Sequence, residues 1–482
     1  MIKIKRYLAL SCVGFAAVTC PSDLMADDFD SNPRPNVLMI IIDDLNDWTS
    51  HLGGHPQLRT PNIDRIVAKG VAFSEAHTMA PQCNPSRRAF FSGLPPFVSG
   101  IYTNSDKNKP GMSEKSLFRY FRQSGYYVAG GGKIIGGEDL EDSTDVFKPK
   151  GPRPKVELML ETGKTANHEW GMLPDSEEGT EAVEDERTVQ LMEQLLAEDL
   201  VRKHNKPFFL ISGFYKPHLP WFVPKRFYDM HPLEQVQLPE ILVNDRYDLD
   251  QDAFCHLTRC NDNNTFDASD KEMRELVRAY MACASYTDEN VGRILDAFEK
   301  GPNRDRETII ILWSDHGYHL GEKQQVAKRT LWNESTRAPF IWVVPGLTPA
   351  GEICNEPVDF SRVYTTLCEL AGLQTPQWVT NRDSLVSLLK NPDNTSRDGF
   401  AVSTYKEGNH SIVSRGYRLI RYSTNAPSSW ELYNEKDDPS EWINLLYGKL
   451  ETLEDLEHSK DPFVRKAVEL NLKLEKYLEA MK

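Results

Sequence analysis

The stretch Asn36-Val37-Leu38-Met39-Ile40-Ile41-Ile42-Asp43-Asp44 is a nearly continuous apolar run that ends abruptly in two aspartates. A run of this kind, without polar alternation, is typical of a strand buried on both faces, as in a parallel sheet covered by helices. The same design recurs downstream, where apolar segments end in glycines, prolines or charged residues, at residues 126–129, 208–214, 308–313 and 340–344.

Segments with apolar residues at helical spacing lie between these predicted strands. Ser113 is the predicted N-cap of one helix, and residues 188–202 and 271–300 form two more. Strands that alternate with helices predict an α/β fold, here a large, mostly parallel sheet sandwiched by helices. In such sheets ligands bind beyond the carboxyl ends of the strands, so the polar residues that follow each strand are the candidate site.

The chain divides by composition into three parts. Residues 1–26 form a predicted signal peptide, residues 27–395 the α/β domain, and residues 396–482 a smaller C-terminal α+β subdomain with short antiparallel strands and a terminal helix. Within the α/β domain, residues 136–186 and 220–264 are polar and irregular. We interpret them as long surface excursions, which are commonly functional at a ligand-binding edge.

The N-terminus has the features of an export signal: a basic start, an apolar centre and a small residue at Ala26. Its apolar part is too short to span a bilayer, and no later run reaches about 18 apolar residues. We therefore expect an exported protein, periplasmic or secreted, with no transmembrane segment in the mature chain. The alternative of a lipoprotein anchored through Cys20 is disfavoured, because Thr19 fits poorly before a lipid-attachment cysteine.

The charge and the cysteines exclude several classes of protein. A formal net charge of −15 argues against nucleic acid or an anionic membrane as a partner, although an anionic substrate can bind a local basic cluster. Cys255 and Cys260 are close enough in sequence to form a disulfide. Six cysteines remain after removal of the signal peptide. If Cys83 is reserved for chemistry, the other five cannot all pair within the chain, so the cysteines do not describe a disulfide scaffold.

Three carboxylates and an imidazole follow two of the predicted strands, at Asp43, Asp44, Asp315 and His316. Adjacent aspartates often mark only a turn or a helix cap. Their position directly after buried strands favours a divalent-cation site instead, because a cation relieves the repulsion between gathered carboxylates. Mostly oxygen ligands point to Ca²⁺, with Mg²⁺ as the alternative.

The segment Cys83-Asn84-Pro85-Ser86-Arg87 precedes an apolar run, which predicts a loop entering a helix. A helix N-terminus favours a negatively charged ligand, and Arg87, one turn along, could reach the same anion. This makes Cys83 a candidate nucleophile in an anion cradle. The alternative interpretation is a buried structural cysteine.

Further basic residues could complete an anion site, although each alone is most simply a solvated surface charge. Lys133 is less ordinary, because it follows three glycines that let the backbone approach a ligand. His218 lies between two prolines and is either structural or a proton donor. The remaining candidates are Lys216, Lys328, Arg329 and Arg87.

Taken in order, these motifs resemble those of the type I, formylglycine-dependent sulfatases of the alkaline phosphatase superfamily. They look closest to the iduronate-2-sulfatase-like branch. The resemblance rests on Cys83-x-Pro85-Ser86-Arg87-x-x-x-Phe91-Ser92-Gly93, Gly132-Lys133, Lys216-Pro217-His218, Ser314-Asp315-His316-Gly317 and Lys328.

The resemblance implies a hydrolase that cleaves a sulfate ester of a sulfated saccharide. A maturation enzyme would convert Cys83 to formylglycine, whose hydrate attacks sulfur. The implied metal ligands are Asp43, Asp44, Cys83, Asp315 and His316. The implied catalytic residues are Cys83, Arg87, Lys133 and Lys328, which meet the sulfate, and His218, which protonates the leaving alcohol. The predicted substrate-binding residues are Lys216, His319 and Arg329.

One departure from the family pattern concerns the histidine that usually follows the glycine-loop lysine by two or three residues. Ile135 and Gly136 stand there, so His319 is a candidate replacement. Two alternative functions remain beside the sulfatase. One is a phosphoester or phosphonate hydrolase of the same superfamily, and the other is a catalytically inactive protein that binds sulfated glycans.

Overall fold

Strand β1 (Asn36–Asp43) lies inside an eight-stranded sheet with the order β14-β2-β13-β10-β1-β8-β4-β5. The computed structural model describes residues 34–135, 140, 142–165, 168–250, 268–380, 382–394, 398–423, 429–450 and 458–481. The other strands of this sheet are β2 (Val71–Phe73), β4 (Tyr127–Gly132), β5 (Val146–Lys148), β8 (Phe208–Pro217), β10 (Thr308–Ser314), β13 (Phe340–Val343) and β14 (Glu352–Cys354).

The centre of the sheet is parallel. Strand β1 pairs in parallel with β10 and β8, and β4 pairs in parallel with β8 and β5. Strand β13 is antiparallel to both β10 and β2, so the fifth predicted strand joins the sheet in the opposite direction. The predicted α/β fold with a mostly parallel sheet is confirmed, and the carboxyl ends of β10, β1, β8 and β4 meet at one edge.

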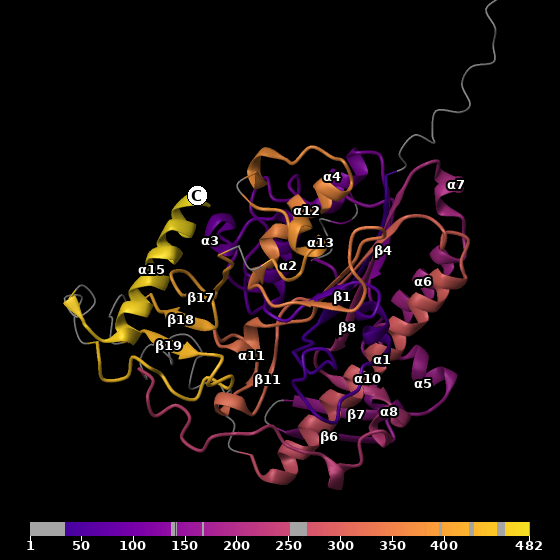
Figure 1. Ribbon diagram of the computed structural model, residues 1–482. Helices are drawn as coiled ribbons and strands as arrows, with labels where there is room; N and C mark the ends of the chain where they lie inside the picture. The colour runs from indigo at the N-terminus through magenta and orange to yellow at the C-terminus, as the bar shows by residue number, and fades with distance from the viewer. Residues whose placement is uncertain are drawn as a thin grey trace, which may run out of the picture. The chain divides into compact units, whose positions relative to one another are not determined.

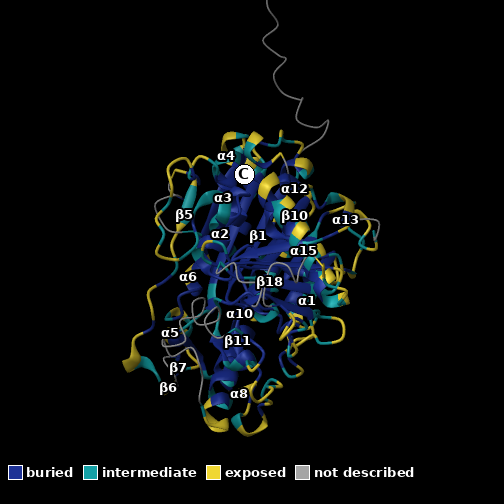
Figure 2. Ribbon diagram, turned by 90° about the vertical axis from the view of Figure 1, so that its left-hand side faces the viewer, coloured by how far each residue is buried: buried dark blue, intermediate teal, exposed yellow. Residues whose placement is uncertain are grey.

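Alternate residues of β1 enter two separate hydrophobic cores, one on each face of the sheet. Leu38, Ile40 and Ile42 pack in the core with helices α1 (Pro61–Val67), α6 (Glu186–Leu196) and α10 (Asp270–Lys300). Val37, Met39 and Ile41 pack in the core with helices α2 (Cys83–Ser92), α4 (Leu117–Gln123), α12 (Val363–Leu370) and α13 (Val386–Lys390). The helices therefore cover both faces (Figure 1), and the strands between them are buried (Figure 2).

Several predicted boundaries need correction. Helix α4 begins after Ser116 rather than at Ser113, and no side chain caps it. The helix predicted over residues 188–202 is two helices, α6 and α7 (Leu200–His204), because Asp199 caps a new start by accepting from Arg202 N–H. Helix α10 confirms the third prediction, and Ser269 with Glu272 forms a capping box at its start.

The first predicted excursion contains regular structure. Strand β5 adds an edge to the main sheet, and β6 (Glu161–Thr165) and β7 (His168–Leu173) form a three-stranded sheet with β9 (Trp221–Pro224). Short helices α5 (Glu177–Glu181) and α8 (Lys225–Asp229) accompany it.

The C-terminal region holds a four-stranded antiparallel sheet and a long helix, α15 (Pro462–Ala480). Its strands are β16 (Ala401–Thr404), β17 (His410–Ser414), β18 (Tyr417–Arg421) and β19 (Glu431–Asn434). Ile412 and Leu419 of this sheet pack with Leu470 and Leu474 of α15 in a separate core. The remaining short elements are β3 (Ala76–His77), β11 (His319–Leu320), β12 (Val326–Ala327), β15 (Val358–Asp359), α3 (Pro96–Ser99) and α11 (Asn333–Thr336).

Some predictions concern residues outside the described part of the chain. These are the signal peptide at 1–26 with Cys20, the Cys255 and Cys260 pair, and Gly136. The domain boundaries at 26/27 and 395/396 also stay predictions. Among the described residues, no helix combines the length and apolar character needed to cross a bilayer.

The core beneath the candidate nucleophile offers a test of the packing. Phe90 of α2 stacks on Trp313 of β10 with ring centroids 3.5 Å apart and both side chains fully buried. We expect Phe90→Ala to lower the free energy of unfolding by about 3 kcal/mol or more, since it leaves a cavity against an aromatic partner. Leu472→Ala, at a position 56% exposed on α15, should change it by less than about 0.5 kcal/mol. Equal denaturation midpoints for the two variants would contradict this packing argument.

Candidate active site

Four neighbouring strand ends and one helix start supply the site. Asp43 and Asp44 lie at the end of β1, Lys133 follows β4, His218 follows β8, and Asp315 with His316 follows β10. Cys83 begins helix α2. Because these strands are adjacent and parallel, their following residues meet at one edge of the sheet.

Cys83 is the first residue of helix α2 and is 5% exposed. Its Sγ lies 3.3 Å from His316 Nε2 and 3.8 Å from Lys133 Nζ. Burial and the charge of Asp43 raise the pKa of the thiol, but Lys133, Lys328 and His316 together outweigh them and hold the pKa well below its usual value. Cys83 therefore lies among positive charges rather than in an inert apolar core.

Four side chains form a group that could hold a metal ion: Asp43, Asp44, Cys83 and His316. One ligand atom from each lies within 4.8 Å of the others, and all four residues are buried. His316 Nδ1 donates to the carbonyl of Gly317 at 3.0 Å, so Nε2 is the ring atom that faces the group and would bind a cation in place of its proton. Two buried carboxylates with a tautomer-fixed imidazole fit an oxygen-preferring divalent cation.

Asp315 lies beside this group and is held by two donors. Its Oδ2 accepts from Arg87 Nε at 2.8 Å, and its Oδ1 accepts from the Asp44 N–H at 3.1 Å. Burial and the neighbouring Asp43 raise the pKa of Asp315 to about 7, although Arg87 acts in the opposite direction. Each carboxylate oxygen keeps a further lone pair, so Asp315 stays a predicted ligand.

Three cations surround the carboxylates. Arg87 Nη2 also contacts Asp43 Oδ1 at 3.2 Å, Lys133 Nζ donates to Asp43, and Lys328 Nζ lies 2.6 and 2.5 Å from the two oxygens of Asp44. Burial raises the pKa of Asp43, but the charges of Lys133, His218 and Arg87 hold it well below its usual value.

The backbone around Lys328 is strained. Ala327 and Arg329, the residues on either side, have φ angles of 103° and 85°, in a region that residues with a Cβ atom rarely adopt. Such strain persists only where the surroundings impose it, which is common at ligand-binding sites. The strain indicates that the orientation of Lys328 is imposed by its surroundings.

His218 lies at the edge of the carboxylate group. Its Nε2 is 4.0 Å from Asp44 Oδ2, and its Nδ1 donates to the carbonyl of Leu219 at 2.6 Å. Nε2 is therefore the atom that can exchange a proton with a bound molecule. The side chain is 23% exposed, so that atom can meet solvent or substrate.

The three predicted substrate-binding residues lie in different surroundings. Lys216 is fully buried, and its Nζ contacts Glu184 at 3.1 Å and the Pro220 carbonyl at 2.6 Å. His319 is also fully buried, and its Nε2 shares a hydrogen bond with Thr330 Oγ1 at 2.8 Å. Arg329 is half-buried and makes no hydrogen bond or ion pair to any residue the structure describes.

His319 therefore has a local partner rather than a contact with Cys83. Burial lowers its pKa to about 3, which leaves the ring neutral at ordinary pH. Its proposed role as the substitute histidine stays a prediction, as do the binding roles of Lys216 and Arg329.

Several residues at the site carried no separate signal in the sequence. Tyr280 of α10 donates to the Asp44 carbonyl at 2.8 Å, which holds the end of β1 from a helix far away in the chain. Asp185 accepts from the Tyr215 and Lys216 N–H groups at 2.5 and 2.9 Å and so holds the end of β8. Only the tertiary structure reveals these contacts.

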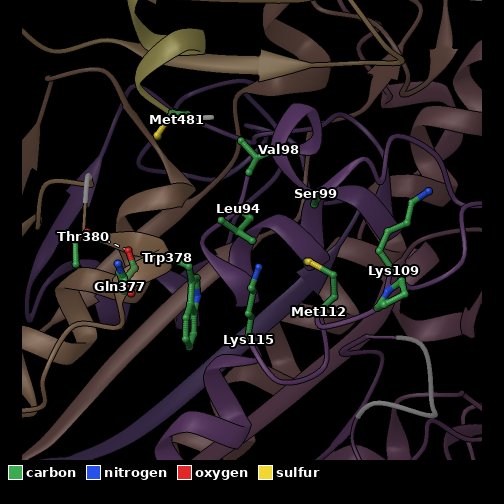
Figure 3. A pocket seen from close by; sticks show the side chains of 11 residues that line it. Leu94, Val98, Ser99, Lys109, Met112, Lys115, Gln377, Trp378, Thr380 and Met481 are labelled. Carbon is green, nitrogen blue, oxygen red and sulfur yellow. Dashed lines mark hydrogen bonds between the residues drawn. The ribbon is translucent and has the colours of Figure 1, made fainter.

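A separate cavity of about 520 Å³ lies beyond the C-terminal end of α2. Figure 3 shows that it is lined by Leu94 and Val98, by Lys109, Met112 and Lys115, and by Trp378 with its neighbours. None of its lining residues is one of the predicted site residues, so it is distinct from the group around Cys83.

Comparison with known proteins identifies the class of enzyme. The sequence matches the family described as "Sulfatase" over residues 35–373, and its residues 321–462 match "N-sulphoglucosamine sulphohydrolase, C-terminal". The chain belongs to the sulfatase family and is a sulfuric ester hydrolase.

The chain is similar to two named relatives and to one solved structure. A "Sulfatase" of Formosa agariphila is 34% identical, with 91% of this chain and 88% of the relative aligned. Human iduronate 2-sulfatase is 29% identical over 71% of this chain and 70% of its own. The structure of a 2-O GAG sulfatase aligns with a TM-score of 0.70 at 21% identity, over 93% of this chain and 92% of that one, and supports the fold alone. Family members in general use a formylglycine and a metal ion.

The donor group predicts a stabilising cation. We expect Ca²⁺ to raise the melting temperature of protein treated with a chelator, corresponding to about 2.7 kcal/mol at 100 times the dissociation constant. Asp44→Asn should weaken the response, because it removes one buried carboxylate ligand. Asp305→Asn, at a side chain 86% exposed, serves as the control and should respond like the wild type. An unchanged response in Asp44→Asn would contradict the assignment.

Proposed function

We propose that this sulfatase removes sulfate from a sulfated saccharide, with residue 83 acting as a formylglycine nucleophile. The observation that carries the proposal is the position of Cys83 Sγ, within 3.3 Å of His316 Nε2 and 3.8 Å of Lys133 Nζ. A buried thiol among cations and metal-ligand side chains is the arrangement expected of a group that is modified and then handles an anion. The relatives that act on sulfated sugars, such as human iduronate 2-sulfatase, support a saccharide substrate.

The basic residues would bind the sulfate group. Lys133 and Lys328 both lower the pKa of the Cys83 thiol, so both ammonium groups act on the atom that faces the sulfur of the substrate. Placed in a buried site, these charges stabilise the negative charge on the sulfate oxygens as it redistributes. Arg87 acts differently, because its guanidinium holds Asp43 and Asp315 in place.

His218 would donate a proton to the departing alcohol. Its Nδ1–H is committed to Leu219, so the proton on Nε2 is the one available, and Nε2 lies 4.0 Å from Asp44 Oδ2 at the edge of the carboxylate group. When the bond between sulfur and the alcohol oxygen breaks, the electron pair goes to that oxygen and the proton follows.

The cation would be held by Asp43, Asp44 and His316, with Asp315 and residue 83 as the further proposed ligands. When bound, Ca²⁺, or Mg²⁺ in its place, supplies Lewis-acid stabilisation of oxygen atoms that carry negative charge. The carboxylates and the imidazole would hold this cation next to residue 83.

The proposal includes export. The predicted signal peptide at residues 1–26 would place the enzyme in the periplasm or outside the cell, where polysaccharide substrates are met. A maturation enzyme would convert Cys83 before or during that export.

The modification can be measured directly. We expect mass analysis of the peptide containing residue 83, from the native host, to show a species lighter than the cysteine form by the difference between CH₂SH and CHO side chains. Cys83→Ala should release no detectable sulfate from sulfated saccharides that the wild type cleaves, because it has no nucleophile. An unmodified cysteine in an active enzyme would refute the formylglycine assignment.

The leaving-group dependence tests His218. We expect His218→Ala to slow sulfate release from a saccharide by roughly 10²–10⁴-fold, the usual value of a general acid. Its effect on 4-nitrophenyl sulfate should be much smaller, because nitrophenolate departs without a proton. A similar loss of kcat/KM on both substrates would show that His218 has another role.

A further inference from the structure

The ring of Tyr215 lies at the centre of a cluster of cationic side chains. Three ammonium groups lie near it, with Nζ-to-centroid distances of 4.9 Å for Lys133, 4.1 Å for Lys150 and 5.1 Å for Lys216. The ring of His218 contacts it as well, with centroids 4.7 Å apart. The aromatic face attracts cations, and the Tyr215 hydroxyl donates to the Leu219 carbonyl at 2.8 Å, which fixes the ring.

Two of these lysines have carboxylate partners and one does not. Lys133 pairs with Asp43, and Lys216 pairs with Glu184. Lys150 makes no hydrogen bond or ion pair to any residue in the described part of the chain, and it is half-buried. Its charge is therefore held near the site by the Tyr215 ring and remains available to a ligand.

The position of Lys150 is set by the fold. It follows edge strand β5 by two residues, and the next residue, Gly151, donates its N–H to the Glu184 carbonyl at 2.7 Å. Burial and the charges of Lys216 and Lys133 lower the pKa of Lys150, whereas Glu184 and Asp185 raise it. An added anion would relieve this repulsion between like charges.

Lys150 shares the Tyr215 ring with Lys133, which the proposed function assigns to the sulfate group. Lys133 and Lys150 both lie close to one ring centroid, so their Nζ atoms are at most about 9 Å apart. That range spans adjacent substituents of one sugar or of two linked sugars. His218, the proposed proton donor to the leaving alcohol, contacts the same ring.

We propose that Lys150, supported by the Tyr215 ring, binds a second anionic group of the substrate, a carboxylate or another sulfate on the saccharide. This inference rests on the proposed function and narrows it to saccharides with more than one anionic group. Lys150 acts on binding and not on the chemistry at sulfur.

The test compares substrates that differ by one anionic group. Sulfated uronate disaccharides are assayed beside their carboxyl-reduced counterparts, and disulfated sugars beside their selectively desulfated counterparts. Lys150→Met removes the ammonium group but keeps an unbranched apolar side chain. In this variant we expect the ratio of kcat/KM for the more anionic to the less anionic member to fall about tenfold, mainly through KM. A lower ratio for the uronate pair would identify the second group as a carboxylate, and a lower ratio for the disulfated pair would identify it as a sulfate.

Two further variants control for folding and for overall charge. Lys150→Arg should retain most of the preference, because it keeps a cation over the ring. Lys155→Met removes an exposed lysine in the same segment and should leave the ratio within about twofold. An unchanged ratio in Lys150→Met, or a wild type that prefers the less anionic member of every pair, would overturn the inference.

Failure of the inference and failure of the proposed function give different results. A wild type that releases no sulfate from any sulfated ester would overturn the proposed function. The subsite is then still tested by calorimetric binding of the same saccharides to Cys83→Ala with and without Lys150→Met. Equal affinities in that comparison would overturn the subsite alone.

Discussion

Carboxylates buried side by side are the constraint on which the site depends. Asp43, Asp44 and Asp315 lie together without exposure to solvent, and an uncompensated buried charge is very costly. Arg87 joins Asp43 and Asp315, and lysines from two other segments donate to Asp43 and Asp44. The cations needed for charge balance are therefore already in place to meet an anionic substrate.

The sheet explains how such distant residues are brought together. Strand β1 is buried on both faces, so its apolar residues pack in two cores. Its polar residues are confined to its two ends, at Asn36 and Asp43. Parallel neighbours bring their own ends to the same edge. Helix α2 then starts at Cys83, and Phe90 of this helix stacks on Trp313 of β10. This contact anchors the helix that carries Cys83 to the strand that precedes Asp315 and His316. The strands β1 and β10 and the helix α2 therefore both form the core and position the residues of the candidate site.

The segment that follows Lys133 departs from the usual sulfatase sequence pattern and carries the proposed second binding position. The segment after Lys133 lacks the usual histidine, and no substitute contact between His319 and Cys83 takes its place among the described residues. The same long segment supplies strand β5 and, after it, Lys150, whose charge faces the Tyr215 ring. The proposed catalytic residues therefore come mainly from strand ends and from the start of α2, whereas the proposed recognition of a second anionic group comes from the segment after β5.

The sequence by itself determined the class of fold, the order of the motifs and the residues of the candidate metal site, because buried parallel strands and the polar residues that end them leave a strong local pattern. It did not determine the antiparallel direction of β13 or the break between α6 and α7, since these follow from pairing and capping contacts. Only the tertiary structure decided that the Lys216 ammonium is paired with Glu184, while Lys150 has no ion pair with a carboxylate of the described residues. Which lysine is neutralised depends on neighbours distant in the chain, and no local pattern records them.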